Sequence, residues 1–384
     1  MLTLAGPAVA ILFAAVFLGI WSYWKRLRYL LWLAAAFFLF SLAALSQILL
    51  IPHDFGLNAV VSCILYTVSV LVFADGILMR LGLRSNYFLN LSLGGVIVGG
   101  IAYFYYIDRS LHARIYILNF GLALLLLATA LKTRRAARRP IDRVLFWTLF
   151  IFALQFFPRT IFTLGYVGSG RDLATLTQSP FWIWLNFSFI VFTVMVGLAL
   201  SAAVVSDIVS TLHRKATTDP LTGLLNRRGF EEFAKHLVSR AAPHPLRMIV
   251  FDIDEFKSIN DLYGHHGGDE VLVRLGSLIS ENIRVSDAAA RLGGEEFAVL
   301  ISNLDRNDVY ALAERLRNEI AQTRFGSGRL RKRMVTASFG VAEVQRGENL
   351  QEALRRADEM LYAAKRAGRN RTIATWLSAG FAAQ

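Results

Sequence analysis

The sequence has a single cysteine among its 384 residues, Cys63. A disulfide within one chain is therefore impossible, and a metal cluster held by several cysteines is excluded.

Glutamate is absent from the first 210 residues, which hold 15 Lys and Arg and 6 Asp. A basic stripe is missing after residue 210, where 26 Lys and Arg are mixed with 22 Asp and Glu. Although the net charge is +13, nucleic acid is not an expected partner.

Polar stretches are scarce in the first half of the chain, and long apolar runs take their place. Overall, 55% of the residues are hydrophobic, which exceeds the usual share in soluble domains. A helix needs about 20 apolar residues to span a bilayer. Seven such runs predict a seven-helix transmembrane sensor domain over residues 1–205: Thr3–Trp24, Tyr29–Ile51, Leu57–Met79, Asn86–Tyr106, Arg114–Leu131, Val144–Tyr166 and Phe181–Val205. Because no basic residues precede the first run, we expect an uncleaved span rather than a signal peptide.

Basic residues gather in alternate connections between these runs. They follow runs one, three, five and seven: Lys25, Arg26, Arg28, Arg80, Arg84, Lys132, Arg134, Arg135, Arg138, Arg139, Arg143, His213, Arg214 and Lys215. The other connections, at residues 52–56, 107–113 and 167–180, hold few. Cytoplasmic loops are the ones enriched in Lys and Arg. We therefore expect a multi-pass protein of a bacterial inner membrane, with a periplasmic N-terminus and a cytoplasmic C-terminal half.

Two charged residues and one glycine pair stand out within the apolar runs. Asp75 and Arg159 are functional candidates because charges inside spans are costly, although snorkelling at the interface is the alternative. Gly95 and Gly99 predict close helix packing. None of these residues identifies a ligand.

The segment 206–218 joins the membrane half to the soluble half. Val205, Ile208 and Leu212 follow one another at spacings near those of a heptad seam. Such a pattern fits a signalling helix that forms dimers, but it also fits a plain connector. Residues 219–375 then make up a soluble domain, and 376–384 a C-terminal tail.

A glycine pair, Gly293-Gly294, lies between two short apolar runs at residues 288–290 and 298–301. This arrangement predicts a β-hairpin whose tip carries Glu295 and Glu296. Glycine lets a large ligand approach the backbone closely. Paired carboxylates suit Mg²⁺ and so a bound phosphate, although a solvated charged turn is the alternative.

Two other segments have motifs that fit the binding of a metal ion and a phosphate. Asp219–Arg228 predicts a turn followed by a helix capped by Asn226. The run Met248–Phe251 predicts a buried strand, which ends at Asp252-Ile253-Asp254. Phe256–Asp261 then opens a helix whose first amides can receive a phosphate.

Together, these motifs resemble the diguanylate cyclase (GGDEF) domain over about residues 217–373. The segments that carry the resemblance are Asp219–Arg228, Asp252–Asp261, Gly264–Asp269, Gly293–Phe297, Ser338–Ala342 and Ala357–Asn370. The fold class implied is an all-α transmembrane bundle plus a cytoplasmic α/β (α+β) palm-like nucleotidyl-cyclase domain with a mostly antiparallel sheet. The implied activity is condensation of two GTP to cyclic di-GMP and two pyrophosphates by a homodimer, controlled by the membrane domain. The alternative is a non-enzymatic membrane receptor that only binds GTP or cyclic di-GMP.

The resemblance also implies roles for individual residues. Asp252, Glu296 and the carbonyl of Ile253 are the expected ligands of Mg²⁺ or Mn²⁺, and either Glu295 or Glu296 assists deprotonation of the ribose 3′-hydroxyl. The substrate contacts are expected from Asn260 and Asp269 to guanine, and from Lys257, Lys365, Arg369 and the amides near Glu255 and Phe256 to the phosphates. Lys257 is grouped with the catalytic residues as well.

The resemblance also implies a product-inhibition site at Arg284-Val285-Ser286-Asp287. Five residues separate this segment from the glycine pair. Arg284 is expected to grip the guanine and phosphate of cyclic di-GMP, and Asp287 to accept from a guanine edge. Arg315 is a third expected member.

Overall fold

The computed structural model describes residues 2–168, 180–239, 246–325, 333–345 and 347–377. Contacts within the chain divide it into two compact units, Met1–Ile208 and Val209–Gln384. Most of the expected connection at 167–180 and of the expected tail at 376–384 lies outside the described residues.

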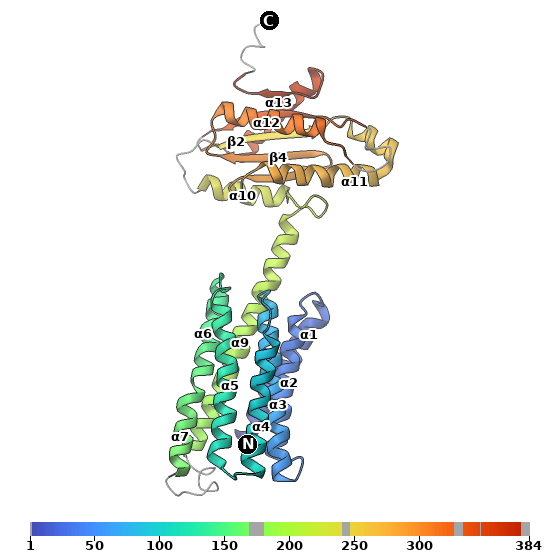
Figure 1. Cartoon of the computed structure of the whole chain (residues 1–384). Helices are drawn as coiled ribbons and strands as arrows, with labels where there is room; N and C mark the ends of the chain where they lie inside the picture. The colour runs from blue at the N-terminus through green and yellow to red at the C-terminus, as the bar shows by residue number, and fades with distance from the viewer. Residues whose placement is uncertain (1, 169–179, 240–245, 326–332, 346, 378–384) are drawn as a thin grey trace. The chain divides into compact units, whose positions relative to one another are not determined.

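The first unit is a bundle of helices (Figure 1). Its helices are α1 (Leu2–Tyr23), α2 (Tyr29–Leu49), α3 (Phe55–Arg80), α4 (Tyr87–Tyr106), α5 (Leu111–Arg134), α6 (Pro140–Leu154), α7 (Phe156–Gly168) and α9 (Pro180–Thr217). Among the described residues, seven helical spans are long and apolar enough to cross a membrane. This finding agrees with the predicted membrane half.

One detail of the bundle differs from the prediction, and one agrees with it. The sixth span is not one continuous helix, because α6 ends at Leu154 and α7 begins at Phe156. Pro158 explains the interruption: it has no N–H to donate to the carbonyl of Leu154, and its ring crowds that carbonyl. The last helix continues without a break through the predicted connector to Thr217.

The predicted packing role of Gly95 and Gly99 is wrong within this chain. A β-carbon added at either position would meet no atom of a neighbouring helix within 4 Å. The close contacts belong to their neighbours, since a β-carbon at Gly94 would lie 3.3 Å from Thr67 and one at Gly100 3.0 Å from Ile117. Gly94 therefore packs against α3 and Gly100 against α5, while Gly95 and Gly99 lie on the exposed side of the helix.

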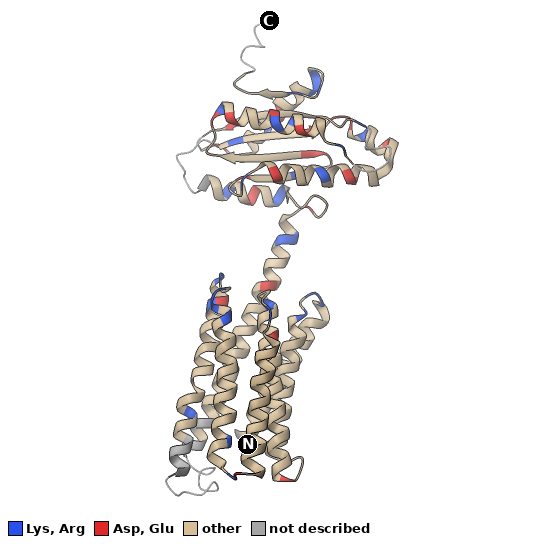
Figure 2. Ribbon diagram, viewed as in Figure 1, with Lys and Arg blue, Asp and Glu red and all other residues tan. Residues whose placement is uncertain are grey.

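Most charged residues of the first unit lie toward the ends of the bundle (Figure 2). At one end, buried Arg80 pairs with Asp142 at 2.8 Å and with Asp207 of α9 at 2.9 Å. Tyr29 donates to Asp207 at 2.8 Å, and Arg139 pairs with it at 3.0 Å. We call these five residues the Arg80 cluster. It joins α2, α3, α6 and the residue before α6 to the last helix of the bundle.

The second unit is a six-stranded sheet with helices on both faces (Figure 1). The strands are β1 (Leu225–Asn226), β2 (Leu246–Ile253), β3 (Ala288–Gly293), β4 (Glu296–Ser302), β5 (Ala337–Val344) and β6 (Thr372–Ala374), in the order β1-β3-β4-β2-β5-β6. The central pairs β3·β4, β4·β2 and β2·β5 are antiparallel, and the outer pairs are parallel. The predicted mostly antiparallel sheet is therefore confirmed.

Alternation along β2 divides the core into two layers. Ile249, Phe251 and Ile253 face helices α11 (Phe256–Asn282) and α12 (Arg306–Gln322). Met248 and Val250 face α10 (Arg227–Ser239) and α13 (Leu350–Arg366). Helix α13 lies so close to β5 that a β-carbon at Gly340 would be 2.0 Å from the carbonyl oxygen of Ala357. This close packing brings the end of α13 to the end of β2.

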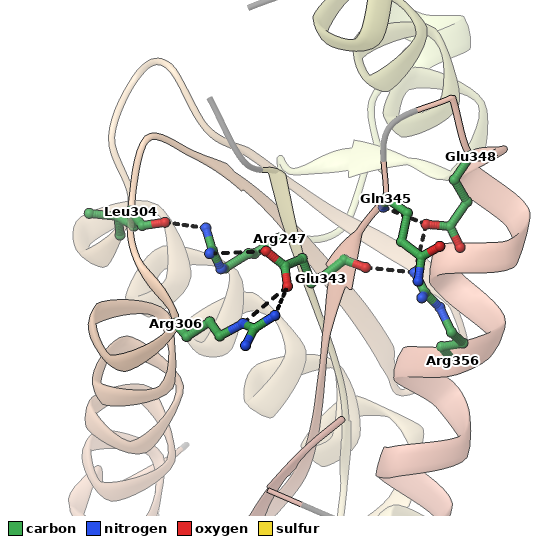
Figure 3. Close-up of polar contacts among 7 residues, drawn as sticks. All are labelled: Arg247, Leu304, Arg306, Glu343, Gln345, Glu348 and Arg356. Atoms are coloured by element: carbon green, nitrogen blue, oxygen red, sulfur yellow. Dashed lines mark hydrogen bonds and ion pairs between the residues drawn. The ribbon is translucent and has the colours of Figure 1, made fainter. Parts of the chain in front are cut away.

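A network of charges lies near the start of β2 (Figure 3). Arg247 is buried and pairs with Glu343 of β5 at 3.2 Å. Arg306 pairs with the same carboxylate at 2.6 Å, and Arg356 donates to the carbonyl of Glu343 at 2.6 Å. The network ties β2 and β5 to both helical layers.

Candidate active site

Two of the predicted metal ligands face each other across neighbouring strands. Asp252 of β2 is paired in register with Glu296 of β4, a placement that sets β-carbons about 5 Å apart. One residue earlier in β2, on the opposite face of the sheet, the ring of Phe251 stacks on Phe297 at 5.4 Å and on Phe339 at 4.5 Å. The packed rings hold the three central strands together near the strand ends that carry the carboxylates.

The predicted hairpin is confirmed, with β3 ending at Gly293 and β4 beginning at Glu296. Gly294 has a positive φ of 29°, which favours glycine at this turn. Arg291 donates to the carbonyl of Gly294 through Nε at 2.8 Å and Nη2 at 2.6 Å. It also lies 3.5 Å from Asp219, whose carboxylate accepts from the Thr222 amide at 2.8 Å. Arg291 and Asp219 thus position the tip that carries Glu295, a role that the sequence patterns did not assign to them.

The end of α13 places a cation on this site. The ammonium group of Lys365 lies 2.8 Å from the carboxylate of Asp252. Burial raises the pKa of Asp252 to about 6, with Glu295 and Glu296 adding to the rise while Lys365 opposes it. Glu295 and Glu296 therefore act on Asp252 together with one lysine, and these three acids outnumber the one cation paired with them.

This donor set fits a hard divalent cation. Asp252 and Glu296 offer carboxylate oxygens, and Ile253, whose carbonyl is the third predicted ligand, follows Asp252 in β2 and is buried as a whole residue. Oxygen ligands of this kind are preferred by Mg²⁺. Among the described residues, no group of three or more His, Cys, Asp or Glu side chains forms a metal site by itself. A metal here would therefore rely on two side chains, a carbonyl and oxygens from a substrate.

The predicted guanine-binding residues come together at a break in α11. Gly264 has φ 71° and ψ 170°, so the helix is interrupted there and resumes. A β-carbon at Gly268 would lie 2.0 Å from the side-chain oxygen of Asn260. Asn260 therefore packs against the backbone next to Asp269, which is exposed.

The predicted phosphate contacts lie on the two segments that flank the end of β2. Glu255 has a left-handed backbone (φ 56°) directly before Phe256, the first residue of α11, and Lys257 is exposed on the same turn. Arg369 is also exposed, and its backbone φ is 63°. The loop that carries Arg369 is held by Asp254, which accepts from the Asn370 amide at 3.0 Å.

Asp254 has a positioning role that the sequence patterns did not reveal. Its buried carboxylate also accepts from Thr336 at 2.8 Å and Ser338 at 2.6 Å. Because these partners come from β5 and the segment before it, the carboxylate joins three separate segments. The only available signal was its place two residues after Asp252, which did not distinguish the two roles.

The expected inhibitory residues lie around the turn between α11 and β3. Asp287 accepts from the Arg284 amide at 3.2 Å and from the Ser302 amide at 3.4 Å, and it is buried. Arg284 is exposed. Arg315 of α12 donates to Asn282 at 3.1 Å, two residues from Arg284. The three residues therefore lie around the same turn. The carboxylate of Asp287 already accepts hydrogen bonds that stabilise this turn.

Comparisons with known proteins agree with this arrangement. Residues 216–371 match the family described as diguanylate cyclase, GGDEF domain. The "Uncharacterized protein YhcK" of Bacillus subtilis is 44% identical over 161 residues, or 41% of this chain and 45% of that protein. "Diguanylate cyclase DosC" of Escherichia coli is 36% identical over 155 residues, or 40% of this chain and 34% of that protein. The chain thus spans less than half the length of these relatives.

A solved structure is also similar. The crystal structure of the coiled coil and GGDEF domain of DgcB from Caulobacter crescentus, in complex with c-di-GMP, has 34% sequence identity and a TM-score of 0.43. The similarity covers 46% of this chain and 97% of that one. With the sheet, the hairpin and the family match in place, residues 216–371 of this chain form a GGDEF domain, homologous to those of diguanylate cyclases and joined to a helical N-terminal region.

Proposed function

We propose that this protein is a membrane-bound diguanylate cyclase that converts two GTP to cyclic di-GMP and two pyrophosphates. The observation that carries the proposal is the pairing of Asp252 with Glu296 at the strand edge, next to Glu295 and Lys365. This cluster of acids has an excess of negative charge that Mg²⁺ or Mn²⁺ would balance. The family match and the name of the relative DosC support the same activity.

The reaction needs two equivalent attacks. The 3′-oxygen of each GTP attacks the α-phosphorus of the other, so two P–O bonds form, two break and two pyrophosphates leave. Glu295 or Glu296 takes the proton of the attacking hydroxyl. Bound Mg²⁺ supplies Lewis-acid stabilisation of charge on the α-phosphate. Lys257, Lys365 and Arg369 hold the phosphates, and correct positioning lowers the barrier.

Asn260 and Asp269 select guanine in this proposal. A carboxylate can accept from the N1 and N2 hydrogens of guanine, which adenine does not present. Because the cyclic product is two-fold symmetric, two protomers each present one GTP. The active form is therefore a homodimer.

The deciding experiment is incubation of the purified full-length protein with GTP and Mg²⁺, followed by separation of the nucleotides. Cyclic di-GMP and pyrophosphate should accumulate, whereas ATP in place of GTP should give no cyclic product. If the protein bound cyclic di-GMP but formed none under conditions in which it dimerises, it would be a receptor rather than an enzyme.

Product inhibition is the second part of the proposal. Arg284 is the best residue for its test, because substitution of Asp287 would also disturb the turn that its carboxylate stabilises. Arg284→Ala removes the planar fork that reads guanine and phosphate. The variant should keep the initial rate and lose both slowing by product and binding of cyclic di-GMP in calorimetry. Arg274→Ala, an exposed arginine on α11, is the matched control; unchanged binding in Arg284→Ala would remove the inhibitory site.

The orientation in the membrane is the third part. The basic connections predict that residues 107–110 lie in the periplasm and residues 135–139 in the cytoplasm. Alkaline phosphatase fused after Asp108 should therefore be active, and the same reporter fused after Ala136 should be inactive. The reverse pattern would place the GGDEF domain outside the cell and contradict the proposal.

A further inference from the structure

The helical unit contains a cavity of about 630 Å³ that the proposed cyclase activity does not use. Its walls come from α1, α2, α3, α5, α6, α7 and α9. Most of the lining is apolar, and phenylalanine rings are prominent in it. A volume in this range accommodates a small organic molecule. The cavity is therefore large enough to bind a ligand within the bundle.

Arg159 is the only charged side chain among the described residues that line the cavity. Its guanidinium lies 4.9 Å from the centre of the Phe189 ring and 5.7 Å from that of Phe156, and its Nη1 atom is buried. The sequence left open whether this arginine snorkels to the membrane interface. The structure instead directs it to an interior space.

A guanidinium has five N–H donors in a planar fork, so it can bind a carboxylate in addition to its other contacts. In an apolar surrounding, such a charge-assisted contact is stronger than in water. Arg159 therefore gives the cavity a preference for an anionic group. A neutral or cationic ligand of the same size would not gain this contact.

Aromatic rings continue from Arg159 across the cavity. Phe189 stacks on Phe40 at 5.5 Å, and Phe40 lies 5.4 Å from Tyr66. Tyr66 donates to Gln47 at 3.4 Å. The cavity thus combines one cationic position with a long apolar surface and a few neutral polar groups. This combination matches a molecule that has a charged head and an apolar body.

We propose that the helical unit binds a small amphiphilic carboxylate, with its carboxylate on Arg159 and its alkyl chain along the phenylalanine rings. Phe189 belongs to α9, the helix that continues to Thr217 at the start of the GGDEF domain. A ligand in the cavity therefore contacts the segment through which the two units are connected. Binding itself is independent of the proposed cyclase activity.

The test uses the full-length protein in lipid nanodiscs and radiolabelled decanoate, without GTP. Decanoate should bind saturably, and unlabelled decanoate should displace it. Decanol and decyltrimethylammonium, which share the chain but lack the negative charge, should displace it at least about tenfold less well, as expected for loss of a contact to a charged group.

Variants locate the contact. Arg159→Gln should weaken decanoate binding at least about tenfold, and Arg159→Lys should weaken it less. Arg114→Gln is the matched control, because Arg114 also lies over an aromatic ring, Tyr105 at 4.9 Å, but is not among the cavity residues. It should bind decanoate as the wild type does.

Three results would overturn the inference. These are no saturable binding, equal displacement by decanol, and equal weakening by Arg159→Gln and Arg114→Gln. Equal displacement by decanol would show that the cavity accepts any alkyl chain, such as that of a lipid. If Arg159→Gln failed to fold, the competition series with wild-type protein would still decide the question. Cyclic di-GMP synthesis by the same sample tests the proposed function separately.

Discussion

The two ends of strand β2 carry clusters of charge that are built in opposite ways. At the start, the buried guanidinium of Arg247 is matched by the carboxylate of Glu343, which the exposed Arg306 also contacts (Figure 3). At the other end, Asp252 lies across from Glu296 and has Lys365 as its cation. Burial and the neighbouring acids keep the pKa of Asp252 raised.

The difference separates a structural cluster from a functional one. Buried charges are costly unless they are paired, and the cluster at the start of β2 meets this requirement with its own residues. The cluster at the end of β2 does not pair all of its own charges. Its excess negative charge would be balanced by a bound cation such as Mg²⁺. Four substitutions and one control variant test this comparison.

The largest effect is expected at the end of β2 that carries Asp252, where acids outnumber cations; we call it the unbalanced end, and the start of β2 at Arg247 the balanced end. Glu296→Gln preserves shape but removes a full charge from the proposed metal site, where the metal contributes several kcal/mol. Cyclic di-GMP synthesis should fall by about a thousandfold, while hydrogen exchange of the β2 amides stays as in the wild type. Near-normal synthesis would show that this acid is not a ligand.

The second effect concerns stability at the balanced end. Glu343→Gln leaves the buried guanidinium of Arg247 without its carboxylate. Unfolding of the second unit should become easier by about 2 to 3 kcal/mol, less than for a fully buried pair because the Glu343 side chain is 29% exposed. Urea-dependent hydrogen exchange of β2 and β5 measures this loss.

Arg306→Gln is the control for that measurement, since its side chain is 56% exposed and exposed pairs contribute about 1 kcal/mol or less. Equal losses in both variants would contradict the assigned importance of Arg247. Turnover per folded molecule should be normal in both.

The third substitution returns to the unbalanced end and has an intermediate effect. Lys365→Met removes the cation from Asp252 and a contact to the substrate phosphates. The GTP concentration needed for half-maximal synthesis should rise about tenfold or more, as expected for a bond to a charged group. In addition, the variant should be less stable in EDTA and regain stability with Mg²⁺, whereas Mg²⁺ should not rescue Glu343→Gln. A rescue of both would erase the distinction between the two ends.

The smallest effect is expected at Asp219, which supports the hairpin through Arg291. The bonds from Thr222 and the charge of Arg291 outweigh burial and lower the pKa of Asp219 below its usual value. Its stabilisation is therefore present above about pH 4 and is lost as the pH falls through the lower pKa of the folded state.

Asp219→Asn should lower the melting temperature at pH 7 by about 2 to 4 °C, the shift for about 1 kcal/mol in a domain of this size. The difference from the wild type should shrink as the pH is lowered to about 2. A difference that is constant with pH would mean that the charge of Asp219 does not matter.

The sequence predicted the scaffold of the candidate site well because that scaffold is local. Short continuous apolar runs, a glycine pair and a terminal aspartate specify the strands and the hairpin, and antiparallel pairing then brings Asp252 opposite Glu296. The pairing of Lys365 with Asp252 was not predictable, because it depends on how closely α13 packs at Gly340. The same holds for Asp254, whose partners lie 82 to 116 residues away.

In the helical unit, the membrane spans were predictable from hydropathy. Which side of each helix packs against its neighbours was not. The periodicity of a uniformly apolar helix carries little information on which side meets a neighbour. For this reason the packing role was assigned to Gly95 and Gly99 instead of Gly94 and Gly100. It is also why Arg159 had two interpretations until the helices around it were placed.

The Arg80 cluster has a consequence for protein engineering. Asp207 fixes the rotational position of α9 through paired charges, which tolerate less displacement than apolar packing because their geometry is directional. Each residue inserted into the helix beyond Asp207 turns everything downstream by about 100° and advances it by about 1.5 Å, while the charge pairs stay intact. The helical residues from Val209 to Leu212, which lie between the contacts of Ile208 with the bundle and of His213 with Glu232, are thus a place where an output domain can be exchanged, or its rotation set in known steps, without rebuilding the bundle.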